Sequence, residues 1–538
     1  MYQPEPQSII FSTLISDIDK GIIKIPQFQR DFVWSLEQSA KLIDSIVKGF
    51  PIGTFILWES DEDLRSIRNI GGANLPSTPP GSMCQYVLDG QQRMTSLYAS
   101  LKGLKVNRDK KEEDFSKIYI DLMAGSEESI VITDISDRDQ SEFVSIQKLL
   151  YGGFAELGAY PPSLHDALQK YKDILTTYRF STILLRGASL DVATEVFTRL
   201  NIGGKSLTVF EIMVAKTYDA DREFDLAEKF EEFITDLEQV GYETISASTV
   251  LQTISVLLKG ECTRKDILKL DKKAFIDIWE EAINSIHKAI EYFRNSYRIP
   301  VSKILPYNAL VVPFAYFFYR HPNKPVNDMK KYLDDFFWRV SLSERYSSSL
   351  EGKIAQDIKR IDRILKSEFP RYEHQLDISK ESIIENGGFN ANRSFIKAIL
   401  CIMAYQEPKS FSDNSIVRIN NDWLKRANSK NYHHFFPKAY LRGEKEDFYI
   451  NHILNITIVD DFLNKNRIRA KAPSNYMGEF KKENNELDKT METHLINDLE
   501  EFGVWEDDYD LFFEKRAEVF KEEFKKRTIS MRNVKSKS

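Results

Sequence analysis

Residues 221–405 show the apolar spacing of helices in segment after segment, with almost no strand signal between them. The repeat is clearest over 224–240, 247–258, 273–293, 308–319 and 329–340. Apolar residues three and four positions apart place one apolar stripe on each helix. These stripes have to be buried against one another, so we expect an all-helical domain that serves as a scaffold or connector.

The regions on either side mix strands and helices. In the first region, short apolar runs predict strands at 22–25, 54–58, 85–88, 117–122 and 181–185. Helical spacing predicts a helix over 9–18, ended by Gly21, and a capping box of Ser35 and Gln38 begins a second helix that Gly49 ends. Residues 60–84 contain Gly-Gly and Pro-Pro-Gly steps and predict a loop. We therefore expect an α+β, multidomain protein with domains at 1–220, 221–405 and 406–538.

Composition narrows the classes of protein that fit. The 538 residues are 42% hydrophobic, enough for real cores, and the three cysteines form no CxxC pair, which suits a reducing cytoplasm. The chain has no run of 18 apolar residues and no signal-peptide pattern, so we expect no membrane association. A net charge of −7 argues against a nucleic-acid coat protein but leaves room for an enzyme with a local basic groove. The basic tail over 525–538 is either a solvated, disordered end or an arm that contacts phosphate.

The adjacent histidines in the last region are an unusual pair. His433 and His434 precede Phe-Phe-Pro, and neighbouring side chains on a strand point to opposite faces, so one imidazole can bind a metal while the other faces a substrate. We expect a second strand over 453–459 with Asn455 inside it, then a short helix over 461–467 that carries Asn464. Phosphodiester hydrolysis needs an activated water and a cation on the developing charge. The alternative is a pair of buried histidines that only hydrogen-bond to backbone.

The order strand, loop, strand, helix with His-His, Asn and Asn resembles the HNH, or ββα-metal, nucleases. The resemblance implies that His433 is a metal ligand, His434 the general base and Asn455 the residue that orients the base. Asn464, nine residues later, would be the second ligand to one Mg²⁺ or Mn²⁺, with Asn466 as the alternative. Four basic residues near these positions would contact DNA, unless they form an ordinary solvated face: Lys438, Arg467, Arg469 and Lys471.

Three polar motifs stand out in the first region, at 25–34, 87–97 and 197–208. In the second motif a strand ends, Asp89-Gly90 turns, and a helix begins whose free N–H groups, with Arg93, would bind an anion. Gly204-Lys205-Ser206 lacks the earlier glycine of a phosphate-binding P-loop. The predicted nucleotide- or phosphate-binding residues are Gln29, Arg30, Asp89, Gly90, Gln91, Gln92, Arg93, Arg199 and Asn201. The alternative is a buried polar network that holds the fold.

Together the three motifs resemble the N-terminal domain of GmrSD-type, modification-dependent (type IV) restriction enzymes. That domain is similar to the ParB/sulfiredoxin-like α/β fold, and the family joins it through a helical segment to an HNH domain, in the order found here. The resemblance implies a metal-dependent DNA endonuclease or nickase of bacterial defence, regulated by a nucleoside triphosphate. Its substrate would be modified or foreign phage DNA, and its protein partners a second copy or other defence-system proteins.

One alternative comes from a different class. The chain could be a nucleotide- or DNA-binding sensor, or a nucleoside triphosphatase, whose HNH-like domain is inactive or secondary. The sequence leaves open which DNA modification is read, which triphosphate is used and whether it is hydrolysed. It also leaves open nicking against double-strand cleavage, the oligomeric state, and the choice between Asn464 and Asn466.

Overall fold

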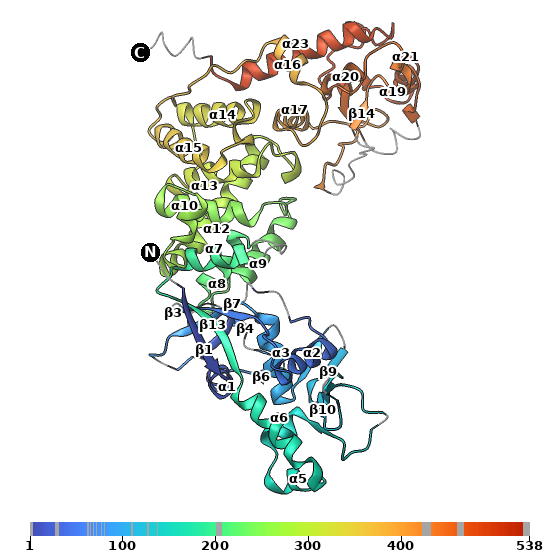
Figure 1. Cartoon of the computed structure of the whole chain (residues 1–538). Coiled ribbons are helices and arrows are strands. Elements are labelled where there is room, and N and C mark those ends of the chain that lie inside the picture. Colours follow the sequence, from blue (N-terminus) through green and yellow to red (C-terminus); the bar gives the residue numbers. More distant parts are fainter. Residues whose placement is uncertain are drawn as a thin grey trace. The chain divides into compact units, whose positions relative to one another are not determined.

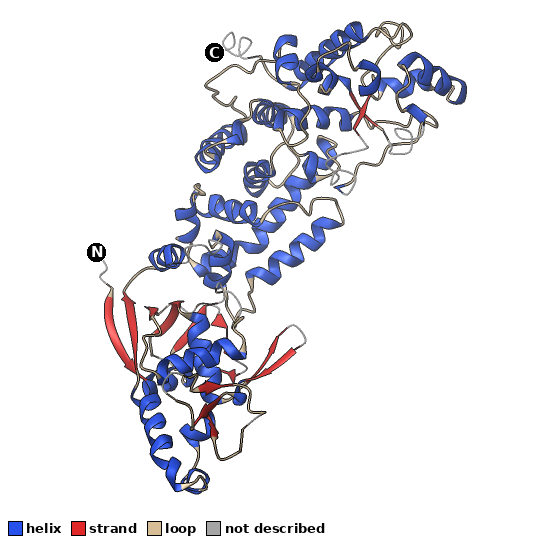
Figure 2. Ribbon diagram, turned by 45° about the vertical axis from the view of Figure 1, so that its right-hand side comes forward, coloured by secondary structure: helices blue, strands red, loops and turns tan. Residues whose placement is uncertain are grey.

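The computed structural model of the chain falls into two compact units, residues 1–226 and 227–538, which are described separately (Figures 1 and 2). The structure describes residues 4–26, 29, 32–61, 64, 66–67, 69–70, 73–76, 78–79, 81–108, 111–125, 128–136, 138–200, 207–421, 432–459 and 467–530. No helix in these ranges is long and apolar enough to cross a membrane.

Unit 1 is built on a mixed six-stranded sheet in the order β1-β13-β3-β7-β2-β4. β13 runs parallel to β3 and β7 parallel to β2, while the other neighbours are antiparallel. The eight residues of β13 largely alternate between exposed and buried, as expected of a strand with one covered face. The strands are β1 (Glu5–Ile10), β2 (Ile23–Pro26), β3 (Thr54–Ser60), β4 (Ser66–Ile67), β7 (Cys84–Asp89) and β13 (Arg179–Arg186).

Smaller sheets and helices complete unit 1. Three further sheets are β11-β10-β12, β5-β6 and β8-β9, from β5 (Asn69–Ile70), β6 (Ala73–Asn74), β8 (Lys105–Arg108), β9 (Lys111–Asp114), β10 (Tyr119–Asp121), β11 (Val131–Ile132) and β12 (Phe143–Ser145). The helices are α1 (Phe11–Asp19), α2 (Leu36–Val47), α3 (Gln91–Lys102), η1 (Phe115–Lys117), α4 (Ile146–Tyr151), α5 (Phe154–Gly158), η2 (Pro162–Leu164), α6 (His165–Thr177), α7 (Leu190–Leu200) and α8 (Val209–Thr217).

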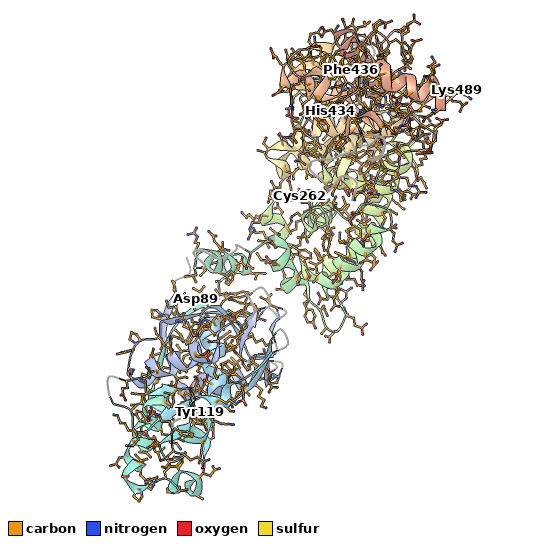
Figure 3. All side chains as sticks on the ribbon, turned by 90° about the vertical axis from the view of Figure 1, so that its right-hand side faces the viewer. Asp89, Tyr119, Cys262, His434, Phe436 and Lys489 are labelled. Atoms are coloured by element: carbon orange, nitrogen blue, oxygen red, sulfur yellow. The ribbon has the colours of Figure 1, made fainter. Side chains whose placement is uncertain are left out.

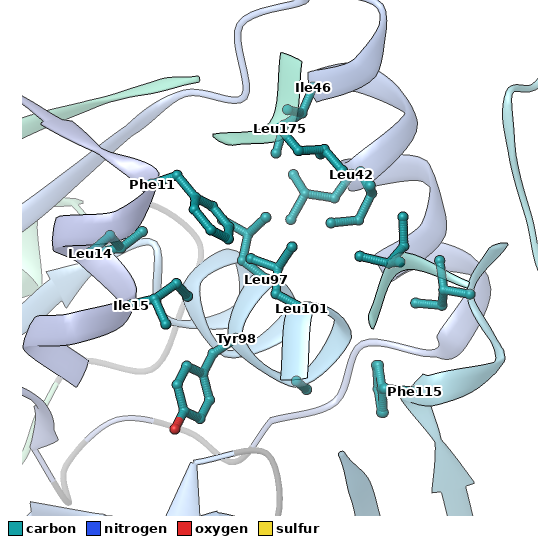
Figure 4. Packing of buried hydrophobic residues seen from close by; sticks show 14 of the residues in the cluster. Phe11, Leu14, Ile15, Leu42, Ile46, Leu97, Tyr98, Leu101, Phe115 and Leu175 are labelled. Atoms are coloured by element: carbon teal, nitrogen blue, oxygen red, sulfur yellow. The ribbon is translucent and has the colours of Figure 1, made fainter. Parts of the chain in front are cut away.

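The core of unit 1 lies where α1, α2, α3 and α6 pack together. Leu97 and Leu101 of α3 point toward Phe11 of α1, Leu42 of α2 and Leu175 of α6 (Figure 4). All five are buried, and each buried leucine or phenylalanine contributes roughly 1.5–3 kcal/mol to the free energy of unfolding. This cluster fixes α3, and therefore the turn that precedes it.

The predicted elements of the first region are largely confirmed, with two corrections. The capping box of Ser35 and Gln38 is present, and both of its hydrogen bonds form. Ile9 and Ile10 lie in β1 instead of the predicted helix, because their backbone pairs with β13. Residues 60–84 are not only loop, since they contain β4, β5 and β6.

Unit 2 begins with helices, as the spacing of apolar residues predicts. They are α9 (Leu226–Glu238), α10 (Ala247–Lys259), α11 (Arg264–Leu268), α12 (Lys272–Ser296), η3 (Ser302–Ile304), η4 (Asn308–Leu310), α13 (Val311–Arg320), α14 (Asn327–Leu342), η5 (Arg345–Ser347), α15 (Leu350–Leu365), α16 (Lys380–Asn386) and α17 (Ser394–Tyr405). Eight consecutive residues of α13, from Val311, are buried, and α13 contacts α10, α12 and α15. A helix that is apolar all round belongs in the middle of its domain.

The last part of the chain folds into the same unit. It contains β14 (Tyr432–His434), β15 (Ile456–Ile458), α19 (Lys438–Leu441), α20 (Asp447–Ile450), η6 (Ile453–Asn455), α21 (Pro473–Glu483), α22 (Leu487–Glu492) and α23 (Tyr509–Arg527). α17 contacts β15, and α16 and α14 contact α23, so the predicted boundary at 405 lies inside unit 2. α23 continues to Arg527, so the first residues of the basic tail are helical instead of disordered.

Candidate active site

The double histidine lies on two short antiparallel strands, β14 and β15. His433 is opposite Thr457 and His434 is opposite Ile456. Because successive side chains of a strand point to opposite faces, the two rings differ in burial: His433 is 2% exposed and His434 is half-buried. The prediction that the pair ends a short strand is confirmed. Figure 3 labels His434 and the nearby Phe436 among the packed side chains of unit 2.

The His433 ring is held at one nitrogen, while its other nitrogen has no partner among the described residues. Nδ1 lies 3.2 Å from the Thr457 hydroxyl oxygen, and that hydroxyl donates to the His433 carbonyl oxygen at 3.5 Å. Thr457 therefore accepts from Nδ1–H, which leaves a lone pair on the buried Nε2. Burial between Phe411 and Tyr476 is the main reason why the pKa of His433 falls to about 3. A neutral imidazole with one nitrogen held and one lone pair open is the form that ligates metals.

His434 is oriented by a residue that the sequence analysis did not identify. Its Nε2 lies 3.0 Å from Oδ1 of Asn451, and the Asn451 amide donates to the carbonyl oxygen of Phe389 at 3.3 Å. Nε2–H therefore donates to Asn451, and Nδ1 carries the lone pair. Burial lowers the pKa of His434 to about 4, against the Asn451 hydrogen bond, and the Lys438 ammonium lowers it further. His434 is neutral at pH 7.

Asn455 fixes the backbone that follows the histidines instead of contacting the His434 ring. Its Oδ1 accepts from the Phe436 N–H at 2.8 Å, and its Nδ2 donates to the carbonyl oxygens of Phe436 and Ile450 at 3.0 and 3.1 Å. The predicted strand position is wrong, because Asn455 ends the 3₁₀ turn η6 and the strand begins one residue later. The Asn455 side chain takes the place of a backbone partner for the turn after His434, so it fixes the main chain next to that histidine.

Two side chains from later helices hold the same strands. The Tyr476 hydroxyl of α21 donates to the carbonyl oxygen of Phe435 at 2.6 Å. Arg516 of α23 is fully buried, and burial lowers its pKa to about 9. Its guanidinium donates to the carbonyl oxygens of Leu454, Ile456, His494 and Leu495. Two of these residues flank Asn455, so Arg516 holds η6 and β15 in place.

Two further buried histidines have structural roles. His452 accepts from the Leu454 N–H at Nδ1 and contacts the Ile384 carbonyl oxygen at 2.9 Å through Nε2. The Nε2 of His494 lies 2.7 Å from the carbonyl oxygen of Lys409. Burial lowers the pKa of each to about 4.

The full ligand set of the predicted metal site is not within the described residues. Asn464 and Asn466 lie outside them, as does the helix predicted over 461–467 except for its last residue. The described residues contain no group of three or more His, Cys, Asp and Glu side chains that could hold a metal ion. His433 Nε2 and His494 Nδ1 are both buried ring nitrogens without a hydrogen-bond partner among the described residues, and a hard cation that keeps several waters needs few protein ligands.

The predicted DNA-contacting cations differ in what they bind. Arg467 and Lys471 form ion pairs with Glu483 and Glu479 of α21, at 2.6 and 2.7 Å. Such exposed pairs contribute about 0–1 kcal/mol, so a phosphate can replace the carboxylate. Lys438 is exposed at the first residue of α19, and Arg469 is exposed with a positive φ of 53°.

In unit 1 the turn between β7 and α3 is formed as predicted. Gly90 is the N-cap of α3, with a φ of 92° and no side-chain cap on the helix. The Arg93 guanidinium donates to the carbonyl oxygens of Ile52 and Thr54 at 2.7 and 3.1 Å and to Asp89 at 3.2 Å. Arg93 therefore stabilises the turn, and no side chain caps the first N–H groups of α3.

The other predicted residues of this set lie partly around the turn. Gln29 donates to the carbonyl oxygens at the end of β7, and Gln92 accepts from the Val33 N–H at 2.8 Å and donates to Gln91. These bonds bring the first two motifs together as a polar network. Arg199 is an exposed residue of α7 paired with Glu195 at 2.6 Å, and Arg30 and Asn201 lie outside the described residues.

Gly90→Ala should destabilise unit 1 strongly. A Cβ at Gly90 would lie 2.5 Å from the Phe55 ring, which is fully buried. At Gly49, also at positive φ, a Cβ would meet nothing within 4 Å. We expect Gly49→Ala to lower the free energy of unfolding by about 1–2 kcal/mol, and Gly90→Ala by a further 1–3 kcal/mol or so. Urea unfolding measures both, and equal losses would contradict the contact with Phe55.

Unit 2 should lose stability as the pH falls below neutral. The pKa of His452 and of His494 is about 4 in the folded chain, against about 6.5 when unfolded. As the pH falls, the unfolded chain binds protons that the folded chain does not, so stability is lost between about pH 6.5 and 4. At pH 5 the loss is on the order of 2 kcal/mol per histidine. Urea unfolding at pH 7.5 and 5 measures it, and a His494→Gln variant with an unchanged pH slope would contradict it.

The turn at Gly90 and the sheet around it lie in a stretch of chain that resembles a known family. Residues 11–218 match the family model of the GmrSD restriction endonuclease, N-terminal domain. The matched GmrSD stretch runs from α1 past the end of α8 and includes the whole polar network of the turn. The match suggests a restriction nuclease. The two histidines of β14 lie beyond the matched stretch.

A relative from an archaeon is similar over both units. The uncharacterized protein MJ0686 of Methanocaldococcus jannaschii is 24% identical to this chain, over 87% of the chain and 86% of that protein. Since 87% is more than either unit holds, the similarity extends from the GmrSD-like N-terminal stretch into unit 2.

Proposed function

We propose that this chain is a metal-dependent DNA endonuclease or nickase of HNH type, regulated by its N-terminal unit. The observation that carries the proposal is the pairing on β14: a buried His433 with an open Nε2 lone pair, next to a neutral His434 held by Asn451. The match of residues 11–218 to the GmrSD restriction endonuclease N-terminal domain supports DNA as the substrate.

His434 is the proposed general base. Its Nε2–H is committed to Asn451, so Nδ1 is the nitrogen that takes a proton from the attacking water. Its depressed pKa keeps it neutral, and therefore competent as a base, throughout the physiological range. Lys438, which lowers the pKa of His434, would contact the substrate phosphate.

His433, with Asn464 or Asn466, would hold one Mg²⁺ or Mn²⁺. A divalent cation bound there supplies stabilisation of the negative charge that develops on the scissile phosphate. Thr457 would orient the His433 ring for binding the cation, and Asn455 holds the turn that follows His434. Lys438, Arg467, Arg469 and Lys471 would contact the DNA backbone on either side of the cut.

The N-terminal unit would regulate DNA cleavage by unit 2. Its uncapped α3 turn, with Gly90 and the N–H groups beyond it, suits the phosphates of a nucleoside triphosphate. We propose that binding there regulates cleavage of modified or foreign phage DNA in the bacterial cytoplasm. A second copy or other defence-system proteins would complete the system.

Cleavage of matched modified and unmodified phage DNA tests this function. Each DNA is incubated with Mg²⁺ or Mn²⁺, with and without each nucleoside triphosphate. We expect nicks or breaks that need the divalent ion and that a triphosphate alters. Binding of nucleotide or DNA without metal-dependent cleavage would favour the alternative of a sensor.

A further inference from the structure

Unit 2 contains a groove away from the double histidine that none of the predicted sites uses. It is a cavity of about 720 Å³ between the C-terminal end of α23, α14 and the end of α17. Figure 1 shows the C-terminal end of α23 beside α14, and the two helices are in contact. We call it the basic groove. Among its described lining residues are five cations, Lys330, Lys331, Lys525, Lys526 and Arg527, and two acids, Asp334 and Glu523.

The exposed charge of the basic groove is positive. Lys525 and Lys526 expose 49% and 67% of their side chains, whereas Asp334 and Glu523 expose 21% and 9%. Asp334 accepts hydrogen bonds from the hydroxyls of Tyr292 and Tyr297 and pairs with Lys330, while Glu523 pairs with Lys526 and Arg527. Lys525 also pairs with Glu522, which is 49% exposed, and such exposed pairs contribute about 0–1 kcal/mol, so a phosphate can replace the carboxylate. A chain with a net charge of −7 thus gathers five cations against two acids along this groove.

The walls of the groove are rigid. The Arg527 guanidinium lies over the rings of Trp338 and Tyr405, at 5.5 and 5.1 Å from their centroids. The chain after α23 is tied down because the Ile529 N–H donates to the buried Asp335 at 2.6 Å and Arg339 donates to the Ile529 carbonyl oxygen. The lysines therefore project from a fixed frame, and binding needs no folding of the walls.

This chemistry fits a repeated phosphodiester better than a base or a single phosphate. Trp338 is buried under Arg527 and offers no open ring for base stacking, which single-strand readers need. The lysines lie on two facing helices instead of converging on one point. Several cations along an open groove can contact a phosphodiester backbone without reading its sequence.

α23 links the groove to the candidate active site. Near its start Phe512 stacks on Phe435, one residue after His434, with ring centroids 4.8 Å apart. From Phe512 to Lys525 the helix rises about 20 Å, at ~1.5 Å per residue. That is about six phosphates along one strand of duplex at ~3.4 Å each. A duplex that runs along α23 from the double histidine would therefore reach the groove.

We propose that the basic groove binds the phosphodiester backbone of the substrate DNA about six base pairs from the cut and holds it there without regard to sequence. The inference rests on the proposed function for its substrate. It adds a DNA-binding site that is separate from the proposed catalytic and metal-binding residues.

Binding without cleavage tests the groove. Full-length His434→Ala protein in EDTA binds a labelled 30-base-pair duplex, followed by anisotropy from 50 to 200 mM salt. The groove variant adds Lys331→Gln, Lys525→Gln and Lys526→Gln, and the control adds Lys265→Gln, Lys269→Gln and Lys273→Gln, with the same change in charge. We expect the groove variant to raise Kd about tenfold or more and to reduce the salt slope by up to about 2.7, which is ~0.9 for each phosphate that is no longer neutralised. The control should stay within about twofold of the parent.

The outcomes separate this inference from the proposed function. Equal Kd values for groove and control variants would overturn the groove, even if the wild-type chain cuts DNA. A polyglutamate competitor as effective as DNA would overturn it in favour of an acidic protein partner. If the parent binds duplex through the groove but the wild-type chain never cuts, the groove stands and the nuclease proposal fails.

Discussion

His434→Ala should lower the rate of DNA cleavage by about 10²- to 10⁴-fold while the protein stays folded. A positioned general base contributes rate factors of this size, and alanine removes the Nδ1 lone pair that takes the proton from water. His434 is half-buried, and among the described residues its ring makes one side-chain hydrogen bond, to Asn451, while β14 and β15 pair through their backbones, so its loss leaves the strands paired. Plasmid nicking with Mg²⁺ or Mn²⁺ under single-turnover conditions measures the change.

A matched control separates loss of the base from loss of any histidine. His374 is exposed elsewhere in unit 2, so His374→Ala should cleave at the wild-type rate. Asn451→Ala should fall between the two, because the ring remains but its orientation is no longer fixed. A His434→Ala protein that nicks as fast as His374→Ala would show that the chemistry lies elsewhere.

Arg516→Ala should be the most damaging single substitution for the stability of unit 2. It leaves four carbonyl oxygens without their donor and opens a cavity between Phe512 and Phe520, over which the guanidinium lies. Loss of a buried hydrogen-bond network together with a cavity lowers the free energy of unfolding by on the order of 4 kcal/mol. Urea unfolding followed by fluorescence measures the loss.

Two companion variants separate the causes. Arg516→Met keeps most of the side-chain volume, so its loss of unfolding free energy measures the effect of the unpaired carbonyl oxygens without that of a cavity. Lys515→Ala removes the neighbouring cation of the same helix, which is half-buried, and should cost less than about 1 kcal/mol. If Arg516→Ala costs no more than Lys515→Ala, Arg516 does not hold η6 and β15.

The elements that could be predicted are those whose signal is local. The helices of 221–405 follow from apolar spacing, and α2 follows from the capping box of Ser35. The predictions failed where a distant partner decides the outcome: Ile9 and Ile10 have helical spacing but pair with β13, far along the chain. Strand pairing is non-local, so no window of sequence reports it.

The same division runs through the candidate site. His433, His434 and Asn455 stand out in the sequence by residue type and order. No motif in the sequence indicates Asn451, which reaches the His434 ring because it lies at the end of α20. The basic groove joins helices nearly two hundred residues apart, which charge patterning along the chain does not reveal.

By itself the sequence determined the helical character of the middle of the chain, the polar turn before α3 and the candidate chemistry of the double histidine. These depend on backbone propensity and on residue type, which act over a few positions. Only the tertiary structure decided which nitrogen of each histidine is open, that Asn455 acts through the backbone, and that Arg516 holds both strands. Those facts depend on burial and on hydrogen bonds between segments that meet only after folding.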